Sequence, residues 1–411
     1  MLDSIAINLH ASSRKNQRFT IGHLAECLLF YGKVDAVISR IELEEIIRKC
    51  SVEHLVELLS SGALSLHINL EFFGSNQTPR TARLNYAIYK VVNHNVETTL
   101  YKALYGVYRS AYKCSQYVKQ LMPFLNEYKY EFDLVGGFLI DEQFTSKAFR
   151  EVVRSVYEEY PIPTDLKFQL HPVPKSTAIE EIGTQFTFET ETNFDLSQFE
   201  KHLEKSGIKG YKDFGVNFMM RASAAIQDVD VSSYFKSELS AEESNASIVQ
   251  KAILNLDQYQ ANNGEVITEF HQFVIPECPS IADAIDLGMK TFADFMHLYR
   301  HAQQFRKWLS EMPDDGDHSI INEYIKFVEM TPFTNSSLFK WLKLIFVSAP
   351  IAINPINLAG QPDLVNNIVN FLAGTAADQY VDLLAQRFNH WRPNQFVQGP
   401  LKNFLKKEES S

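Results

Sequence analysis

Leu64-Ser65-Leu66-His67-Ile68-Asn69-Leu70-Glu71-Phe72-Phe73 is the stretch that decides the fold. Its even-numbered residues are all apolar, and the odd-numbered residues from Ser65 to Glu71 are all polar. Successive side chains of a β-strand point to opposite faces of its sheet, so this alternation predicts a strand with one face exposed to water.

The residues before this stretch alternate strand and helix patterns. Short apolar runs at Ile5–Leu9 and Val34–Ser39 predict strands, and apolar residues at helical spacing predict helices over Thr20–Tyr31 and Glu42–Ser61. Gly62 stands where a glycine often ends a helix. A strand, a helix and another strand in this order predict a βαβ-type unit at the N-terminus.

The middle of the chain continues with mixed patterns. A long helical pattern covers residues 96–121, and Glu131–Ile140 predicts a strand. A helix is expected over about Ser146–Tyr157, followed by a strand over Phe186–Phe194. Asp195 then predicts the N-cap of a further helix, which Gly207 ends.

Beyond residue 215 the patterns are mostly helical. The clearest helix is expected from Ile281 to about Leu309, with further helices at Leu338–Ile353 and Leu364–Phe388. The aromatic residues after Trp391 are expected to fold back onto this region as anchors. We therefore predict an α+β architecture with three parts: an N-terminal α/β unit with a long Tyr/Lys-rich helix (1–130), a central β–α region (131–215) and a helical C-terminal domain with an aromatic tail (216–411).

Composition limits the classes of function. The formal net charge of −11 over 411 residues argues against a general nucleic-acid coat, because phosphate backbones require clustered Lys and Arg. No phosphate-loop, dinucleotide or esterase-elbow motif is present, and no cofactor is indicated. The four cysteines lie far apart and are expected to be buried free thiols. Without a secretory signal pattern, a cytoplasmic location is expected.

The most informative feature for function is the segment Arg80–Tyr130. It holds eight basic and two acidic residues, and half of the eighteen tyrosines of the chain. Within the helical pattern 96–121 the tyrosines and the basic residues form two adjacent stripes. The candidate partner-binding residues in these stripes are Tyr101, Lys102, Tyr105, Tyr108, Arg109, Tyr112 and Lys113.

Three interpretations of these stripes are open. Basic residues beside aromatic rings suit single-stranded nucleic acid or another anionic partner, which they bind through phosphate neutralisation and base stacking. Tyrosine is also common in protein interfaces, so a protein partner fits as well. The structural alternative is that the tyrosines pack inward while the lysines form an ordinary solvated face.

Two patterns could hold a metal ion. Glu189 and Glu191 lie on one face of the strand expected at Phe186–Phe194, with Asp195 just beyond, and could share a divalent cation in a hydrolytic site. His297 and His301 lie four residues apart on a helix and could bind a metal from one face. A wet strand face and a helix surface produce the same patterns without any metal.

The segments Phe305-Arg306-Lys307-Trp308-Leu309 and Trp391–Leu401 resemble an uncharacterised group of bacterial proteins, and Gly22–Val34 extends the similarity towards the N-terminus. The resemblance implies no activity. In that group the region equivalent to Leu344–Ala377 is richer in glycine and alanine, as in a membrane-seeking hairpin. This sequence departs from the pattern through polar residues that are costly in lipid: Asn354, Asn357, Gln361, Asp363, Asn366 and Asn367.

The sequence favours a non-catalytic interaction or regulatory protein that binds an anionic or protein partner through residues 96–121. One alternative is a metal-dependent hydrolase that uses the carboxylates near 189–195. The other is a membrane-active effector that uses the helices at 338–388. Integral insertion is not expected, whereas peripheral contact through Lys340, Trp341 and Lys343 is open.

Overall fold

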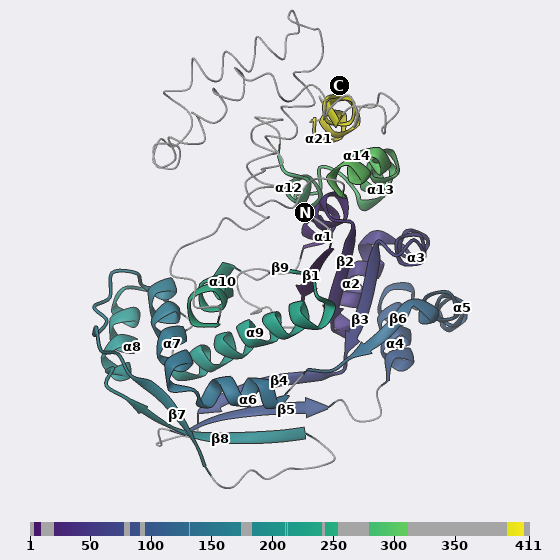
Figure 1. Cartoon of the computed structure of the whole chain (residues 1–411). Coiled ribbons are helices and arrows are strands. Elements are labelled where there is room, and N and C mark those ends of the chain that lie inside the picture. The colour runs from purple at the N-terminus through teal and green to yellow at the C-terminus, as the bar shows by residue number, and fades with distance from the viewer. Residues whose placement is uncertain are drawn as a thin grey trace, which may run out of the picture. The chain divides into compact units, whose positions relative to one another are not determined.

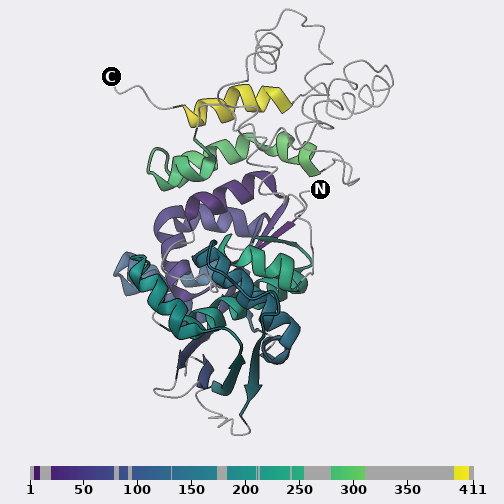
Figure 2. The same cartoon turned by 90° about the vertical axis from the view of Figure 1, so that its left-hand side faces the viewer.

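The protein, seen in a computed structural model, is described for residues 4–9, 20–77, 83–90, 95–130, 132–173, 183–209, 211, 213–240, 243–253, 279–310 and 393–406. It forms two compact units (Figures 1 and 2). The first comprises Leu2–Ala261 with Thr291–Ala293, and the second comprises Asn262–Lys290 with Asp294–Ser411. Two sheets and many helices make the fold α+β, as predicted.

A five-stranded parallel sheet forms one half of the first unit. Its order is β6-β3-β2-β1-β9, and every neighbouring pair is parallel. The strands are β1 (Ser4–Asn8), β2 (Lys33–Ile38), β3 (Leu64–Asn69), β6 (Leu125–Tyr128) and β9 (Glu238–Ser240). Helix α1 (Ile21–Phe30) connects β1 to β2, which confirms the predicted βαβ unit.

Two patterns that looked continuous in the sequence are each interrupted. The helix expected over Glu42–Ser61 is two helices, α2 (Arg40–Cys50) and α3 (Val52–Ser60), because Ser51 takes a φ of 61°. The strand expected over Leu64–Phe73 is β3 followed by β4 (Glu71–Gln77), which belongs to a second sheet. At that break the Asn69 side chain accepts the Glu71 backbone N–H at 2.6 Å, a local turn that asparagine commonly makes.

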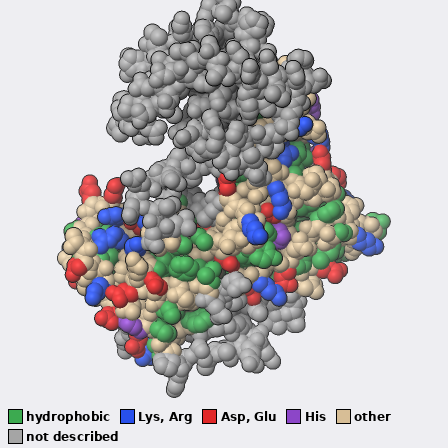
Figure 3. All heavy atoms as spheres, viewed as in Figure 1, with side chains coloured by type: hydrophobic (Ala, Val, Ile, Leu, Met, Phe, Trp, Pro, Cys, Tyr) green, Lys and Arg blue, Asp and Glu red, His purple; other side chains and the backbone are tan. Residues whose placement is uncertain are grey.

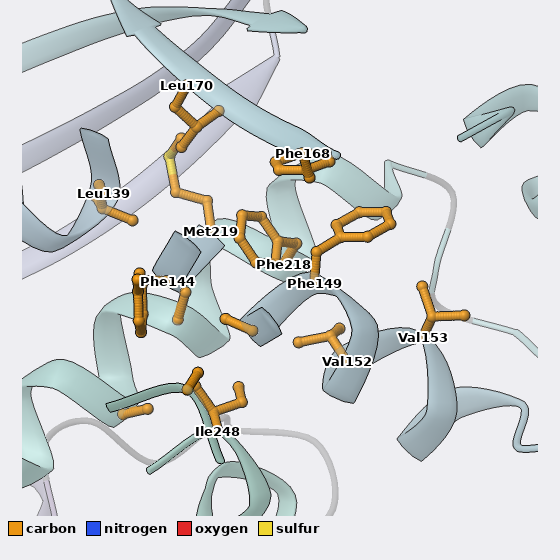
Figure 4. Close-up of a cluster of buried hydrophobic side chains, with 14 of the residues drawn as sticks. Leu139, Phe144, Phe149, Val152, Val153, Phe168, Leu170, Phe218, Met219 and Ile248 are labelled. Carbon is orange, nitrogen blue, oxygen red and sulfur yellow. The ribbon is translucent and has the colours of Figure 1, made fainter. Parts of the chain in front are cut away.

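The second sheet is antiparallel and has four strands in the order β4-β5-β8-β7. It contains β5 (Arg83–Lys90), β8 (Gly183–Thr192) and β7 (Phe168–Pro172). Its inner face builds a hydrophobic core, part of which Figure 4 shows, and most of the aromatic side chains of this core come from the sheet and from three helices. The helices are α7 (Glu142–Val156), α8 (Leu196–Lys205) and α9 (Phe214–Phe235).

One predicted strand is wrong. Glu131–Ile140 was expected to be extended, but α6 (Phe132–Ile140) is a helix. Val135 and Leu139, four residues apart, are buried, whereas Leu134 and Ile140 are partly exposed. This is the spacing of a helix with one apolar side, which the adjacent glycines at 136 and 137 obscure in the sequence.

Helix α9 packs against both sheets of the first unit. The Tyr128 hydroxyl at the end of β6 donates to Asp230 on α9 at 2.9 Å. On the other side the Gln227 side-chain amide of α9 donates to the Tyr86 hydroxyl of β5 at 3.4 Å. All four side chains are buried, so each bond partners polar groups that would otherwise be costly, although the Gln227 side-chain oxygen has no hydrogen-bond partner among the described residues. The boundary expected after residue 215 falls inside this helix.

The second unit is helical where it is described. The single helix expected from Ile281 to Leu309 is three helices: α12 (Ile281–Asp286), α13 (Phe292–His301) and α14 (Gln303–Ser310). Gly288, which was expected within one continuous helix, has a φ of 72° just after α12 and ends it.

The C-terminal tail is anchored as predicted. It forms α20 (Pro393–Phe396), a π-helical turn at Val397–Leu401 and α21 (Lys402–Leu405). Phe396 is buried, and its ring stacks on Phe305 of α14 with centroids 4.7 Å apart. The tail therefore contacts α14 through α20.

Within the described ranges, no helix combines the length and apolar character needed to cross a bilayer. The helices expected at Leu338–Ile353 and Leu364–Phe388, with the candidate lipid contacts Lys340, Trp341 and Lys343, lie outside the described residues.

Phe149 of α7 offers a direct test of the aromatic core. Its side chain is fully buried, and its ring stacks on Phe168 at 4.2 Å and meets Phe218 edge to face at 5.3 Å. We expect Phe149→Ala to lower the free energy of unfolding by about 3–5 kcal/mol, because the lost contacts leave a cavity. Urea unfolding measures this. Ile140→Ala, at a half-exposed site, serves as the control and is expected to cost about 0.5 kcal/mol or less.

Asp35 of β2 is expected to make the stability of the fold depend on pH. Its carboxylate is buried 2.7 Å from Lys33 Nζ and 3.9 Å from His67 Nε2. Burial by itself would raise the pKa of Asp35, but the contacts to His67 and Lys33 outweigh it, and the pKa lies below its usual value.

Because the pKa of Asp35 is lower in the folded chain, its contribution to stability is complete above pH ~4 and is lost as pH falls through the folded pKa. Asp35→Asn should cost about 1–3 kcal/mol at pH 7. Denaturation from pH 7 downwards should show this difference shrinking below pH ~4. A difference that does not depend on pH would contradict the assignment.

Candidate functional site

The helical pattern at 96–121 is not one helix. It is α4 (Val96–Tyr108) and α5 (Ala111–Leu121), separated by Arg109, which takes a left-handed backbone conformation with φ 52° and ψ 23°. Ser110 then caps α5 by accepting the Lys113 backbone N–H at 3.4 Å. The two predicted stripes therefore do not continue across this turn, which separates the candidate residues into groups with different surroundings.

Four of the candidate residues meet at a hollow between α2 and α4. Its volume is about 310 Å³, at the lower end of the range for small-molecule sites. Its lining residues come from both helices and from the turn after α4: Arg40, Glu44, Tyr101, Lys102, Tyr105, Gly106 and Arg109. We call this site the α2–α4 hollow.

Gly106 permits the two helices to approach closely. A Cβ atom at this position would lie 2.5 Å from Glu44 Oε2, so any other residue would displace the Glu44 carboxylate. The carboxylate is held from the other side by Arg48, whose Nη2 lies 2.6 Å from Glu44 Oε1. Arg48 also pairs with Glu45, with its Nη1 2.7 Å from Glu45 Oε2, so one guanidinium is shared by two carboxylates. The hollow thus contains a positioned carboxylate that keeps part of its negative charge.

Tyr101 and Tyr105 form an aromatic wall of the hollow. They are one helical turn apart on α4, and their ring planes differ by 14° with centroids 6.2 Å apart. Tyr105 is 43% exposed and Tyr101 is partly buried. Two nearly parallel rings beside solvent provide π-faces on which a planar group can stack.

The charged groups of the hollow are mostly positive. The exposed residues Arg40, Lys102 and Arg109 line it with one carboxylate, Glu44, which shares Arg48 with Glu45. Two guanidinium groups and one ammonium group within one small site favour an anionic ligand. In Figure 3, Lys and Arg side chains lie beside hydrophobic ones in the part of the surface where Figure 1 labels α3 and α5.

Tyr108 has a structural role. Its ring packs against Tyr117 of α5 with centroids 4.9 Å apart, and its hydroxyl accepts a backbone hydrogen bond from Val52 at the start of α3. Burial, followed by the electrostatic effects of Tyr117, Glu53 and Cys114, raises its pKa. Tyr108 therefore joins α4 to α3 and α5 and does not line the hollow.

The two remaining candidates of this set lie on α5. Tyr112 is 76% exposed, and Lys113 beside it is exposed. Neither lines the α2–α4 hollow. They lie exposed on α5, beyond the left-handed turn at Arg109.

The carboxylates proposed for a hydrolytic metal site each have a partner of their own. Glu189 accepts from Arg83 at 2.7 Å, Glu191 lies 2.9 Å from His171 Nε2, and Asp195 accepts the Gln198 backbone N–H at 2.9 Å as the N-cap of α8. Among the residues described, no group of three or more His, Cys, Asp and Glu side chains could hold a metal ion. The structure thus supplies local structural reasons for all three residues.

His297 and His301 are exposed on α13 with ring centroids 4.6 Å apart. His301 Nδ1 lies 2.8 Å from the His297 carbonyl oxygen, which occupies one nitrogen of that ring. The pair lacks the further ligands that a protein zinc site uses, within the part of the chain that is described.

A cysteine–histidine pair on α1 also resembles a catalytic arrangement. Cys27 Sγ lies 3.7 Å from His23 Nε2. Burial, with a smaller effect of Glu26, raises the pKa of the Cys27 thiol well above its usual value. A thiol that stays protonated is a poor nucleophile, so the geometry does not support catalysis.

Sequence patterns did not identify Arg40, Glu44 and Gly106 as parts of the site. Arg40, Glu44 and Arg48 share one face of α2 at four-residue spacing, but no sequence pattern shows that this face meets α4. The one available signal was Gly106, because a glycine inside a helical pattern often marks a close approach.

Comparisons with protein-family models, with curated proteins and with solved structures found no match to this chain.

Gly106→Ala tests the geometry of the hollow. The new methyl group must displace the flexible Glu44 side chain, which costs little, and alanine improves helix propensity by about 1 kcal/mol. We expect the free energy of unfolding to change by about 1 kcal/mol or less while the hollow is reshaped. Urea denaturation measures the first effect, and a crystal structure of the variant shows whether Glu44 has left Arg48. A Glu44 side chain that stays in place would contradict the packing described.

Proposed function

We propose that this protein is a non-catalytic interaction protein that binds an anionic partner at the α2–α4 hollow and along the adjoining surface of α5. The observation that carries the proposal is the gathering of Arg40, Lys102 and Arg109 beside two exposed or half-buried tyrosine rings. Cations with aromatic faces bind anions that also carry planar groups, through charge and stacking together.

We place the protein in a reducing compartment, such as the cytoplasm of a bacterial cell. Cys27, Cys50 and Cys114 are free and buried. Disulfides are rare where glutathione keeps thiols reduced.

The two alternative functions have less support. The hydrolase would need Glu189, Glu191 and Asp195 to share a cation, whereas each is bound to a different local partner. The membrane-active effector depends on residues 338–388, which lie outside the described ranges.

Charge reversal tests the proposal. We expect the triple variant Lys102→Glu, Arg109→Glu, Lys113→Glu to lose at least about tenfold in affinity for anionic probes, since each neutralised anion contact also releases counterions. The probes are a fluorescent single-stranded oligonucleotide and a fluorescent polyglutamate peptide, measured by anisotropy at two salt concentrations.

The matched control carries the same change of charge elsewhere in the first unit: Lys201→Glu, Lys205→Glu, Lys209→Glu, all exposed on or just after α8. It should bind like the wild type apart from a small uniform loss. If both variants bound every probe with equal affinity, the α4–α5 surface would not be the binding site.

A further inference from the structure

We propose that the α2–α4 hollow is a binding site for one ribonucleotide unit, either free or within single-stranded RNA. The inference rests on the proposed function and specifies its ligand. It follows from three kinds of group that line one small site: cations, an aromatic pair and a carboxylate.

The carboxylate decides between classes of anion. The side chains of an acidic peptide, or inorganic phosphate, present mainly hydrogen-bond acceptors, so they offer the Glu44 carboxylate little to accept from. A ribonucleotide presents an anion and hydroxyl donors on the same molecule, and a carboxylate that accepts from the 2′-hydroxyl is a known way to recognise ribose. Glu44 is 24% exposed, and its ion pair with Arg48 occupies only part of its capacity to accept hydrogen bonds.

The other two kinds of group complete the match. The nearly parallel rings of Tyr101 and Tyr105 offer a face for a base, and every base can stack on such a face. Arg40, Lys102 and Arg109 supply charge for the phosphate. A volume of about 310 Å³ suits one nucleotide unit, so the site would hold a single base and its sugar phosphate.

The position of Glu44 is fixed by the fold. Gly106 leaves room for the carboxylate against α4, and Arg48 holds it from within α2. A carboxylate fixed in this way lies beside the rings and the cations before any ligand arrives, which reduces the cost of ordering the site on binding.

The test uses calorimetry and anisotropy on the full chain with four probes: adenosine 5′-monophosphate, 2′-deoxyadenosine 5′-monophosphate, and eight-nucleotide single strands of oligoadenylate RNA and DNA. We expect the ribose form to bind more tightly in each pair. Binding of the monophosphate shows a free nucleotide as the ligand, whereas binding of the RNA strand alone shows a nucleotide within single-stranded RNA.

Two variants with matched controls make the assignment specific. Tyr105→Ala should weaken binding roughly 5- to 100-fold, while Tyr105→Phe keeps the stacking face and should stay within about twofold. Glu44→Gln keeps the shape but weakens acceptance from the 2′-hydroxyl, so the preference for ribose over deoxyribose should fall towards one. A structural role of Glu44 alone would leave that preference unchanged.

The outcomes separate this inference from the proposed function. If the polyglutamate peptide binds and loses affinity in the triple charge-reversal variant while no nucleotide probe binds, the ribonucleotide assignment is overturned and the anion-binding function stands. Equal binding of RNA and DNA, with Glu44→Gln increasing both, also overturns the assignment. If no anionic probe binds at all, both proposals fail.

Discussion

Helix α9 is the element on which the rest of the first unit depends. It lies against the parallel sheet through the Tyr128–Asp230 hydrogen bond and against the antiparallel sheet through Gln227 and Tyr86. Hydrogen bonds between buried groups depend strongly on distance and angle, so these two bonds restrict the position of the helix. With α9 in place, each sheet buries one face against it. The helices that lie between β1 and β6 in the sequence can then expose their other faces to solvent.

The α2–α4 hollow results from constraints that are local to those helices. Ser39 and Glu42 form a capping box that starts α2, so Arg40 is placed at its first turn. Gly106 lets α4 approach the Glu44 carboxylate, and the left-handed residue Arg109 ends α4 and turns the chain into α5. A left-handed conformation is unfavourable for a residue with a side chain, and Ser51 and Lys236 likewise take a positive φ at the ends of helices.

The sequence predicted which helices and strands form more accurately than where they begin and end. Alternation in Leu64–Phe73 correctly indicated a strand, but the Asn69 turn that sends β4 into another sheet depends on one side-chain hydrogen bond. The breaks at Ser51 and Arg109 have no glycine or proline to mark them, because the surrounding packing holds a residue in a positive φ that its type does not favour.

For the site, Tyr101, Lys102, Tyr105 and Arg109 were predictable from their stripes, whereas Arg40 and Glu44 required the packing of α2 on α4. Tyr108 belongs to the same stripe, but its side chain contacts α3 and α5. Helical periodicity alone does not show which residues of a stripe other helices cover.

The central claim is that an anionic ligand with a planar group occupies the α2–α4 hollow. Fluorine NMR of the full chain with 3-fluorotyrosine placed at position 105, and in a separate sample at position 112, tests it most directly. Tyr105 lines the hollow and Tyr112 does not, although both are exposed. Adding the single-stranded RNA should shift the resonance of position 105 much more than that of position 112, and added salt should reverse the shift. An unchanged resonance at position 105 while the RNA is bound, or a shift confined to position 112, would contradict the account.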